Sequence, residues 1–237
     1  MAGIGRGLVA AFLSQPKNAV IAGVRNLQSE ETVSLRDLPA ADGSHLILVK
    51  LDNTSSTDVG TAVRHIQSEF GIQSIDIAIS NAGICDHLLP AADMDLNELH
   101  KHVDTNAYGV LRLFQGLWPM LRESPAPKFI CISSGLGSIS LSASNDAAIG
   151  AYGLSKAAAN YLIAKIGAEN PSLVAFSIDP GLVQTDMGNR GARFAGLEVA
   201  PVTIQQSVEG IVREIEISSR SRNNGRFTTY NGKTIPW

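Results

Sequence analysis

Tyr152 and Lys156 stand four residues apart, in the segment Tyr152-Gly153-Leu154-Ser155-Lys156. On an α-helix this step places both side chains on one face. A phenol has an ordinary pKa of about 10 and a neighbouring ammonium group stabilises the phenolate, so we expect Lys156 to lower the pKa of Tyr152. Such a phenol can act as a general acid or base. The spacing alone is a weak signal, because it also occurs on solvated helix faces.

Asn106 is a polar residue on an otherwise apolar helix face. We predict one long helix over Leu96–Arg122, with a buried stripe at three- and four-residue steps. The stripe consists of Leu96, Leu99, Val103, Asn106, Val110, Leu113 and Leu117. A buried amide without partners costs about 1–3 kcal/mol. Asn106 therefore either braces the backbone or belongs to a polar site, and the helix alone favours bracing.

Glycines and a basic residue near the start of the chain indicate a dinucleotide site. Gly3-Ile4-Gly5 runs directly into an amphipathic helix, where backbone N–H groups can approach a pyrophosphate. About 20 residues later, where dinucleotide folds read the adenosine ribose, a strand ends at Arg25 and Asn26. An arginine suits a 2′-phosphate, so the sequence predicts NADP(H). The alternative is a solvated arginine at a strand end.

Polar and small residues also follow the next two predicted strands. Asp52 and Asn53 end one of them, and Asp52 could accept a hydrogen bond from an adenine amino group. The other ends in Ser80-Asn81-Ala82-Gly83, where Asn81 can contact ribose and Ala82 and Gly83 permit close approach of the backbone. Ligands of open α/β sheets bind at this carboxyl edge.

The elements that must position these residues alternate between short β-branched runs and stretches of helical period, a pattern typical of parallel βαβ units. The predicted strands are Asn18–Val24, His45–Lys50, Ile75–Ser80, Lys128–Ser133, Leu173–Ile178 and Arg226–Tyr230. The other predicted helices are Gly5–Ser14, Thr57–Phe70, Ala151–Gly167 and Thr203–Ile217. No repeat or linker divides them, so we expect a single domain over residues 1–237.

Composition narrows the classes of function. The chain has 44% hydrophobic residues and a net charge of -3 with scattered cations, which speaks against nucleic-acid or membrane partners and favours a small-molecule ligand. Cys85 and Cys131 lie in or beside apolar runs and support neither a disulfide framework nor a metal site. With no leader and no long apolar segment at hand, we expect a cytoplasmic protein.

Taken in order, these signals, together with Ser133-Ser134 at a strand end, resemble the short-chain dehydrogenase/reductase family. The resemblance covers essentially the whole chain and includes the segment 179–187, DPGLVQTDM, similar to the family's loop over the nicotinamide and pyrophosphate. It implies an α/β fold, a Rossmann-like doubly wound parallel sheet with helices on both faces. The tail and the Gly137-Ser138-Ile139 stretch are similar to C-factor-like carbonyl reductases and fungal polyketide ketoreductases.

The resemblance implies roles for the central residues. Tyr152 would protonate a carbonyl oxygen, and Lys156 would bind the nicotinamide ribose and tune the phenol. Asn106 would hold a water that connects Lys156 to solvent. Ser134 would hydrogen-bond the substrate oxygen, but it lies 18 residues before Tyr152, more than the family's usual gap, so Ser138 is the alternative.

The same resemblance implies that Pro180, Gly181, Val183 and Thr185 meet the carboxamide and phosphates. Only a short segment, 187–200, follows this loop, so we expect an open pocket, lined in part by 136–149 and 187–200, for a bulky or aromatic ketone. The resemblance also implies a possible homo-oligomer through the long helix and the helix carrying Ala157-Ala158-Ala159, because small residues let helices pack closely, with a monomer as the alternative.

The family's first strand and first glycine have no counterpart before Gly3. In the family's strand order that strand lies mid-sheet, so its two neighbours should lack backbone partners and the cofactor should bind more weakly.

These observations predict an NADPH-dependent reductase of ketones or aldehydes. The alternative is an N-terminally truncated, weakly active or non-catalytic nucleotide-binding homologue. A sugar-nucleotide epimerase or dehydratase is disfavoured, because it would need an added C-terminal substrate domain.

Overall fold

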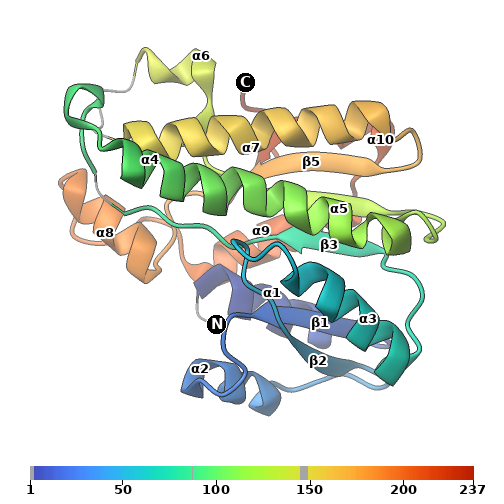
Figure 1. The fold of residues 1–237 in the computed structure, drawn as a ribbon. Helices are drawn as coiled ribbons and strands as arrows, with labels where there is room; N and C mark the ends of the chain where they lie inside the picture. Colours follow the sequence, from blue (N-terminus) through green and yellow to red (C-terminus); the bar gives the residue numbers. More distant parts are fainter. Residues whose placement is uncertain (1–2, 87, 145–148) are drawn as a thin grey trace.

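The strands form two parallel sheets in the computed structural model, which describes residues 3–86, 88–144 and 149–237 (Figure 1). One sheet pairs β1 (Ala19–Val24) with β2 (His45–Lys50). The other has the order β3 (Ile77–Ser80), β4 (Lys128–Ile132), β5 (Val174–Asp179) and β6 (Phe227–Thr229). Every strand predicted from the sequence is confirmed to within two residues at each end.

The two sheets are not joined by a backbone ladder in the described residues, because β1 and β3 are both edge strands. This confirms the prediction that two neighbouring strands would lack partners in the middle of the fold. In an uninterrupted doubly wound sheet another strand lies between them. Contact between the halves therefore depends on side chains, chiefly those of the covering helices.

Helices cover both faces of the four-stranded sheet. The helices are α1 (Gly3–Leu13), α2 (Glu30–Val33), α3 (Asp58–Phe70), α4 (Leu96–Val103), α5 (Gly109–Leu121), α6 (Ile139–Ser142), α7 (Gly150–Glu169), α8 (Asp186–Phe194), α9 (Ile204–Glu216) and α10 (Arg220–Asn223). In Figure 1, α4, α5 and α7 lie in front of the four-stranded sheet, with α9 behind it. Short 3-10 turns occur at Ser34–Asp37, Ala91–Asp93 and Gly135–Gly137.

Alternating side chains divide the core between these two layers. On one face, Phe129 and Cys131 of β4 pack with α5 and α7, whereas Ile130 and Ile132 point to the opposite face, toward α1 and α9. Such alternation follows from the period of two along a strand. On α1, Leu8 packs against the four-stranded sheet, whereas Val9 and Leu13 pack against β1. Helix α1 therefore bridges the two sheets.

The predicted helix Leu96–Arg122 is interrupted. A π-helical turn at Asp104–Tyr108 separates α4 from α5, and α5 ends at Leu121. Such turns are frequent at functional sites. The prediction of a continuous buried stripe was also wrong at its first position, because Leu96 opens α4 with 66% of its surface exposed.

The short helices α2, α6, α8 and α10 were not predicted, since elements of four to nine residues leave little periodicity to detect. The longest of them, α8, begins where the Thr185 hydroxyl accepts a hydrogen bond from the Gly188 backbone at 3.0 Å. Asp186 occupies its first turn, where an acidic residue is favoured. Among the described helices none has both the length and the hydropathy needed to span a bilayer.

Candidate active site

Tyr152, Lys156 and Ser134 meet at the carboxyl edge of the four-stranded sheet. Tyr152 and Lys156 lie on the first turns of α7, with the Lys156 Nζ atom 5.8 Å from the centre of the Tyr152 ring. The Ser134 hydroxyl, just beyond the end of β4, forms a hydrogen bond with the phenol of Tyr152. The Lys156 ammonium donates to the backbone oxygen of Ile132 at 2.9 Å. The structure thus brings together the three residues that the sequence singled out.

The expected effect of Lys156 on the phenol is not observed. Burial raises the pKa of Tyr152 above its ordinary value, and the Cys85 thiol adds to this increase, whereas the hydrogen bond from Ser134 opposes it. Burial also lowers the pKa of Lys156. The prediction of a lowered phenol pKa was therefore wrong for this structure, because desolvation of both groups outweighs their proximity. Tyr152 is held in its protonated form, as a proton donor requires.

The two candidate serines have different surroundings. The Ser138 hydroxyl is buried and donates to the backbone oxygen of Pro236 at 2.6 Å, so it anchors the C-terminal tail. Ser134 accepts from the Leu136 backbone at 3.2 Å and also reaches Tyr152. This arrangement favours Ser134 over Ser138 as the serine next to the reacting oxygen.

Asn106 braces the segment that follows β3. Its side chain accepts from the Ile84 backbone N–H at 2.8 Å and donates to the Ile84 carbonyl at 2.9 Å. It also donates to the Ser155 hydroxyl at 2.9 Å. These hydrogen bonds show that Asn106 braces the backbone at Ile84. The water-holding role that the family resemblance implies stays a prediction. A methyl group added at Gly83 would lie 3.1 Å from Oδ1 of Asn106 and 3.3 Å from Nζ of Lys156.

Gly3, at the start of α1, faces the loop after β5. Gly3 has a left-handed backbone with φ of 61°, and a Cβ atom placed there would lie 2.9 Å from Cγ2 of Thr185. Ile4 packs into the core beside the four-stranded sheet, and Gly5 is buried. Predicted phosphate-binding residues from opposite ends of the sequence, Gly3 and Thr185, are thus neighbours at the start of α1.

The rest of that loop is held in place by its neighbours. Gly181 has φ of 79°, the Pro180 carbonyl accepts from Ser207 of α9 at 2.8 Å, and Val183 is buried and bridges to Val202. A fixed loop of this kind presents its backbone groups without reorganisation on ligand binding.

The residues predicted to bind adenosine lie at the ends of β1 and β2. Arg25 and Asn26 are exposed, and the charge of Arg25 lies close enough to Asp52 to lower the pKa of that carboxyl group. The largest cause of this lowered pKa is the hydrogen bond from the Thr54 backbone, at 2.9 Å. Asp52 is therefore an ionised acceptor beside a cation. Its neighbour Asn53 is buried, and its Nδ2 atom has no partner in the described residues.

The segment after β3 runs past the centre of the site. Asn81 and Ala82 precede Gly83, which faces Asn106 and Lys156 as described above, and Asn81 is partly buried whereas Ala82 is exposed. The lack of a side chain at Gly83 keeps the space between Asn106 and Lys156 open.

Sequence reasoning missed a cluster that ties this segment to the helices around it. The Arg190 guanidinium, on α8, donates to the Cys85 carbonyl at 3.0 Å and lies 3.6 Å from the Asp86 carboxylate. The Asp86 backbone donates to Nε2 of buried His102 at 3.1 Å, and Lys101 contacts the Asp86 carboxylate at 3.3 Å. The sequence analysis did not predict α8, and without that helix nothing indicated that Arg190 lies beside Cys85 and Asp86.

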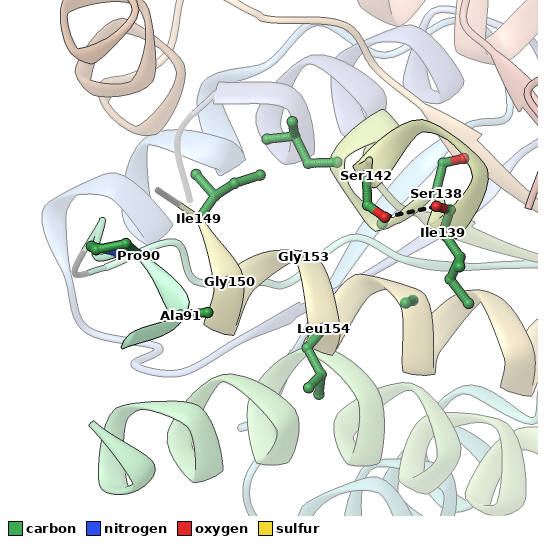
Figure 2. Close-up of a pocket in the computed structure, with 12 residues that line it drawn as sticks. Pro90, Ala91, Ser138, Ile139, Ser142, Ile149, Gly150, Gly153 and Leu154 are labelled. Carbon is green, nitrogen blue, oxygen red and sulfur yellow. Dashed lines mark hydrogen bonds between the residues drawn. The ribbon is translucent and has the colours of Figure 1, made fainter. Parts of the chain in front are cut away.

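An apolar cavity of about 510 Å³ lies beside the first turns of α7 (Figure 2). It is lined by Pro90, Ala91, Leu136, Gly137, Ser138, Ile139, Ser142, Ile149, Gly150, Gly153, Leu154 and Ala157. Six of these lining residues belong to the 136–149 loop, of which 145–148 lie outside the described residues. The described lining residues of this cavity include neither Ser134 nor Tyr152 and none from 187–200, so the expected lining of the substrate pocket stays a prediction.

The described residues fit a nicotinamide dinucleotide. Glycine without a side chain at positions 3 and 83 leaves room beside Thr185 and beside Lys156, which a Cβ atom would fill. A cation and an ionised carboxylate stand at the ends of β1 and β2, and a proton donor, Tyr152, stands on the first turn of α7. Together, the fold and these residues define a dinucleotide-binding oxidoreductase.

The comparison with family models agrees. Residues 1–193 match the model of the short chain dehydrogenase family, and the protein belongs to that family. The match covers the region from α1 to α8, so it includes Tyr152, Lys156 and Ser134.

Curated relatives and solved structures extend the comparison. The chain is 45% identical to the norsolorinic acid ketoreductase of Dothistroma septosporum over 99% of its own length and 89% of the relative's. It is 40% identical to the norsolorinic acid ketoreductase of Emericella nidulans, covering 99% and 90%. Its structure is similar to an NADPH-bound carbonyl reductase from chicken fatty liver, with a TM-score of 0.86, 26% identity, and coverage of 99% and 95%.

Proposed function

We propose that this protein is an NADPH-dependent reductase that converts a ketone to an alcohol. The observation that carries the proposal is the Ser134–Tyr152 hydrogen bond, with the Lys156 ammonium 5.8 Å from the phenol ring, at the edge of the sheet where α/β enzymes bind ligands. The names of the curated relatives and the NADPH-bound structural neighbour support both the reaction and the cofactor.

A reduced nicotinamide, when bound, supplies the hydride. The chain's own residues handle the oxygen and the proton. Tyr152, whose pKa burial raises, donates its phenolic proton to the carbonyl oxygen as that oxygen gains negative charge. The Ser134 hydroxyl lies beside the same phenol and holds the carbonyl oxygen in line with it. Lys156 would contribute positive charge and would contact the nicotinamide ribose.

The remaining predicted residues would bind the cofactor. Gly3, Ile4 and Gly5 with Thr185 would surround the pyrophosphate, and Pro180, Gly181 and Val183 would present backbone groups to the carboxamide. Arg25 and Asn26 would contact the 2′-phosphate and Asp52 the adenine, while Asn81, Ala82 and Gly83 would contact the ribose. The planar guanidinium of Arg25 can form two parallel hydrogen bonds with a phosphate, which supports a preference for NADPH over NADH.

The cavity beside α7 supports a ketone with a bulky apolar portion. Its volume of about 510 Å³ falls within the range of small-molecule sites, and its lining includes Leu136, Ile139 and Ile149. Burial of an apolar ring system against these side chains would bind the part of the substrate that does not react. Aldehydes without such a portion would bind more weakly.

The test is NADPH consumption with a panel of aromatic and aliphatic ketones and quinones, on the wild type and on Tyr152→Phe. Loss of the general acid should lower kcat by about 10²–10⁴-fold while NADPH binding, followed by nicotinamide fluorescence, is retained. Equal turnover by both proteins would refute the assignment of Tyr152. Failure of the wild type to bind NADPH would instead favour the non-catalytic alternative, which the comparisons do not favour.

We propose a cytoplasmic location, a single domain and a possible homo-oligomer. Cys85 and Cys131 are free thiols, as is usual in a reducing compartment. The exposed side chains of Tyr108 and Tyr161 support self-association, whereas Ala159 packs in the core and is not available for it. Light scattering after gel filtration would measure the oligomeric state.

A further inference from the structure

Asp179 is a carboxylic acid at the centre of the site that the roles above leave without a function. It is the last residue of β5, and its backbone oxygen accepts from Tyr230 at 2.8 Å. Its side chain is partly buried, turned inward from the strand end toward the region of Tyr152 and Lys156. A partly buried carboxyl group needs hydrogen-bond donors to offset its desolvation.

Two backbone amides supply those donors, and each belongs to a different wall of the site. The Gly181 N–H donates to Oδ1 of Asp179 at 3.1 Å. The Gly135 N–H also donates to this carboxyl group, and a Cβ atom placed on Gly135 would lie 3.4 Å from Oδ2. Gly135 directly follows Ser134, and Gly181 directly follows Pro180. One carboxylate therefore connects the turn that carries the serine with the loop predicted to contact the carboxamide.

We propose that Asp179 is a positioning residue for the reduction: its carboxylate fixes the distance between the Ser134 turn and the Pro180–Gly181 turn, and places negative charge beside Tyr152 and Lys156. This inference rests on the proposed function for its consequence in catalysis. Small displacements of a group that orients the reacting oxygen have large effects on rate. Asp179 acts on the substrate only through Ser134 and Tyr152.

The charge of Asp179 acts in the same direction as the burial of the phenol. Burial and the Cys85 thiol raise the pKa of Tyr152, with smaller contributions from Asp179 and Cys131. The hydrogen bond from Ser134 lowers it, and Lys156 lies on the same helix. The pKa of Asp179 is itself raised, because burial outweighs the two amides and Lys156, which lower it. Loss of the Asp179 charge should therefore make the phenol easier to ionise.

The test begins on cofactor-free protein. Tyrosinate absorbance is titrated in the wild type and in Asp179→Asn, and in both with Tyr152→Phe added, so that the difference isolates Tyr152. We expect the Tyr152 titration to move to lower pH in Asp179→Asn, an effect that a merely structural residue would not produce. Asp76→Asn, at the exposed amino end of β3, is the matched control and should leave the titration unchanged.

Kinetics then test the connection between the two turns. Asp179→Asn keeps one accepting oxygen, whereas Asp179→Ala keeps none, so kcat should fall by about tenfold to about a hundredfold in Asp179→Ala and less in Asp179→Asn. If Asp179→Asn does not fold by circular dichroism, Asp179→Ser takes its place. An unmoved titration together with an unchanged kcat would overturn the inference. Absence of reductase activity in the wild type would refute the proposed function, while the titration would still decide the assignment of Asp179.

Discussion

The Nζ atom of Lys156 lies 2.9 Å from the backbone oxygen of Ile132, the last residue of β4. This contact draws the ammonium toward the strand end and leaves the Tyr152 hydroxyl to pair with Ser134. Burial lowers the pKa of Lys156 and raises the pKa of Tyr152. In this arrangement burial disfavours the charged form of each group.

The pH dependence of the two reaction directions should therefore differ. Reduction needs the protonated phenol, and the pKa of Tyr152 is raised, so the rate should not decline until the pH exceeds the ordinary phenol value of about 10. Oxidation of the alcohol needs the phenolate and should speed up as the pH rises. Profiles of kcat/KM in both directions test this, and a decline in reduction centred near neutral pH would contradict it.

Arg25→Asp should change the preference between cofactors. Hydrogen bonds to a charged group contribute about 1.5–3 kcal/mol, so KM for NADPH should rise by about 10- to about 100-fold, with little change for NADH. Arg122→Asp is the control, because Arg122 lies between α5 and the amino end of β4, away from the ligand edge. A change in NADPH affinity that is equal in both variants would show that overall charge, rather than Arg25, decides the preference.

The two serines should separate activity from stability. Ser134→Ala removes a hydrogen bond to the phenol on the edge of the site, so kcat should fall while the free energy of unfolding changes little. Ser138→Ala removes the hydrogen bond from the buried Ser138 hydroxyl to the Pro236 carbonyl, which should lower the free energy of unfolding by about 0.5–1.5 kcal/mol. Denaturant titration and turnover on both variants measure the difference. The reverse pattern would assign the catalytic role to Ser138.

Asn106→Ala should lower the free energy of unfolding as well as the reductase activity. The substitution leaves the N–H and carbonyl of Ile84 and the Ser155 hydroxyl without this partner, at a cost of about 1–3 kcal/mol for a buried group left unsatisfied. Asn97→Ala, at an exposed position of α4, should change the free energy of unfolding by less than about 0.5 kcal/mol. Similar losses in the two variants would exclude the bracing role.

Arg190→Ala should raise KM more than it lowers kcat. Arg190 connects α8 to the segment after β3 through the Cys85 carbonyl and the Asp86 carboxylate, and exposed ion pairs contribute about 0.2–1 kcal/mol. An increase in KM of about two- to fivefold corresponds to that range. Lys101→Ala removes another partner of Asp86 without touching α8, so KM should stay near the wild-type value.

The strands and the pair of Tyr152 and Lys156 could be predicted because each depends on residues that are close together in the sequence. Runs of β-branched residues mark β1 to β5, and a four-residue step is enough to place Tyr152 and Lys156 on one face of α7. The glycines of α1 and the arginine after β1 were found from their separation along the chain.

Contacts between distant segments could not be predicted in this way. Asp179 precedes Pro180-Gly181, a combination that reads as a turn, and nothing near it in sequence indicates that Gly135 donates to its side chain. The raised pKa of Tyr152 depends on burial by segments that are far away in the sequence. The π-helical turn at Asn106 was hidden because one extra residue hardly disturbs an apolar repeat.

The separation of β1–β2 from β3–β6 has a consequence for how the molecule responds to a ligand. The proposed adenosine contacts belong to the smaller sheet and the proposed nicotinamide contacts to the larger one. An extended dinucleotide would therefore contact both sheets and hold them together. Hydrogen exchange of β1 and β2 amides should then slow sharply on saturation, since their opening would have to release the bound molecule as well. In this fold, binding of the cofactor and association of the two sheets would be thermodynamically coupled.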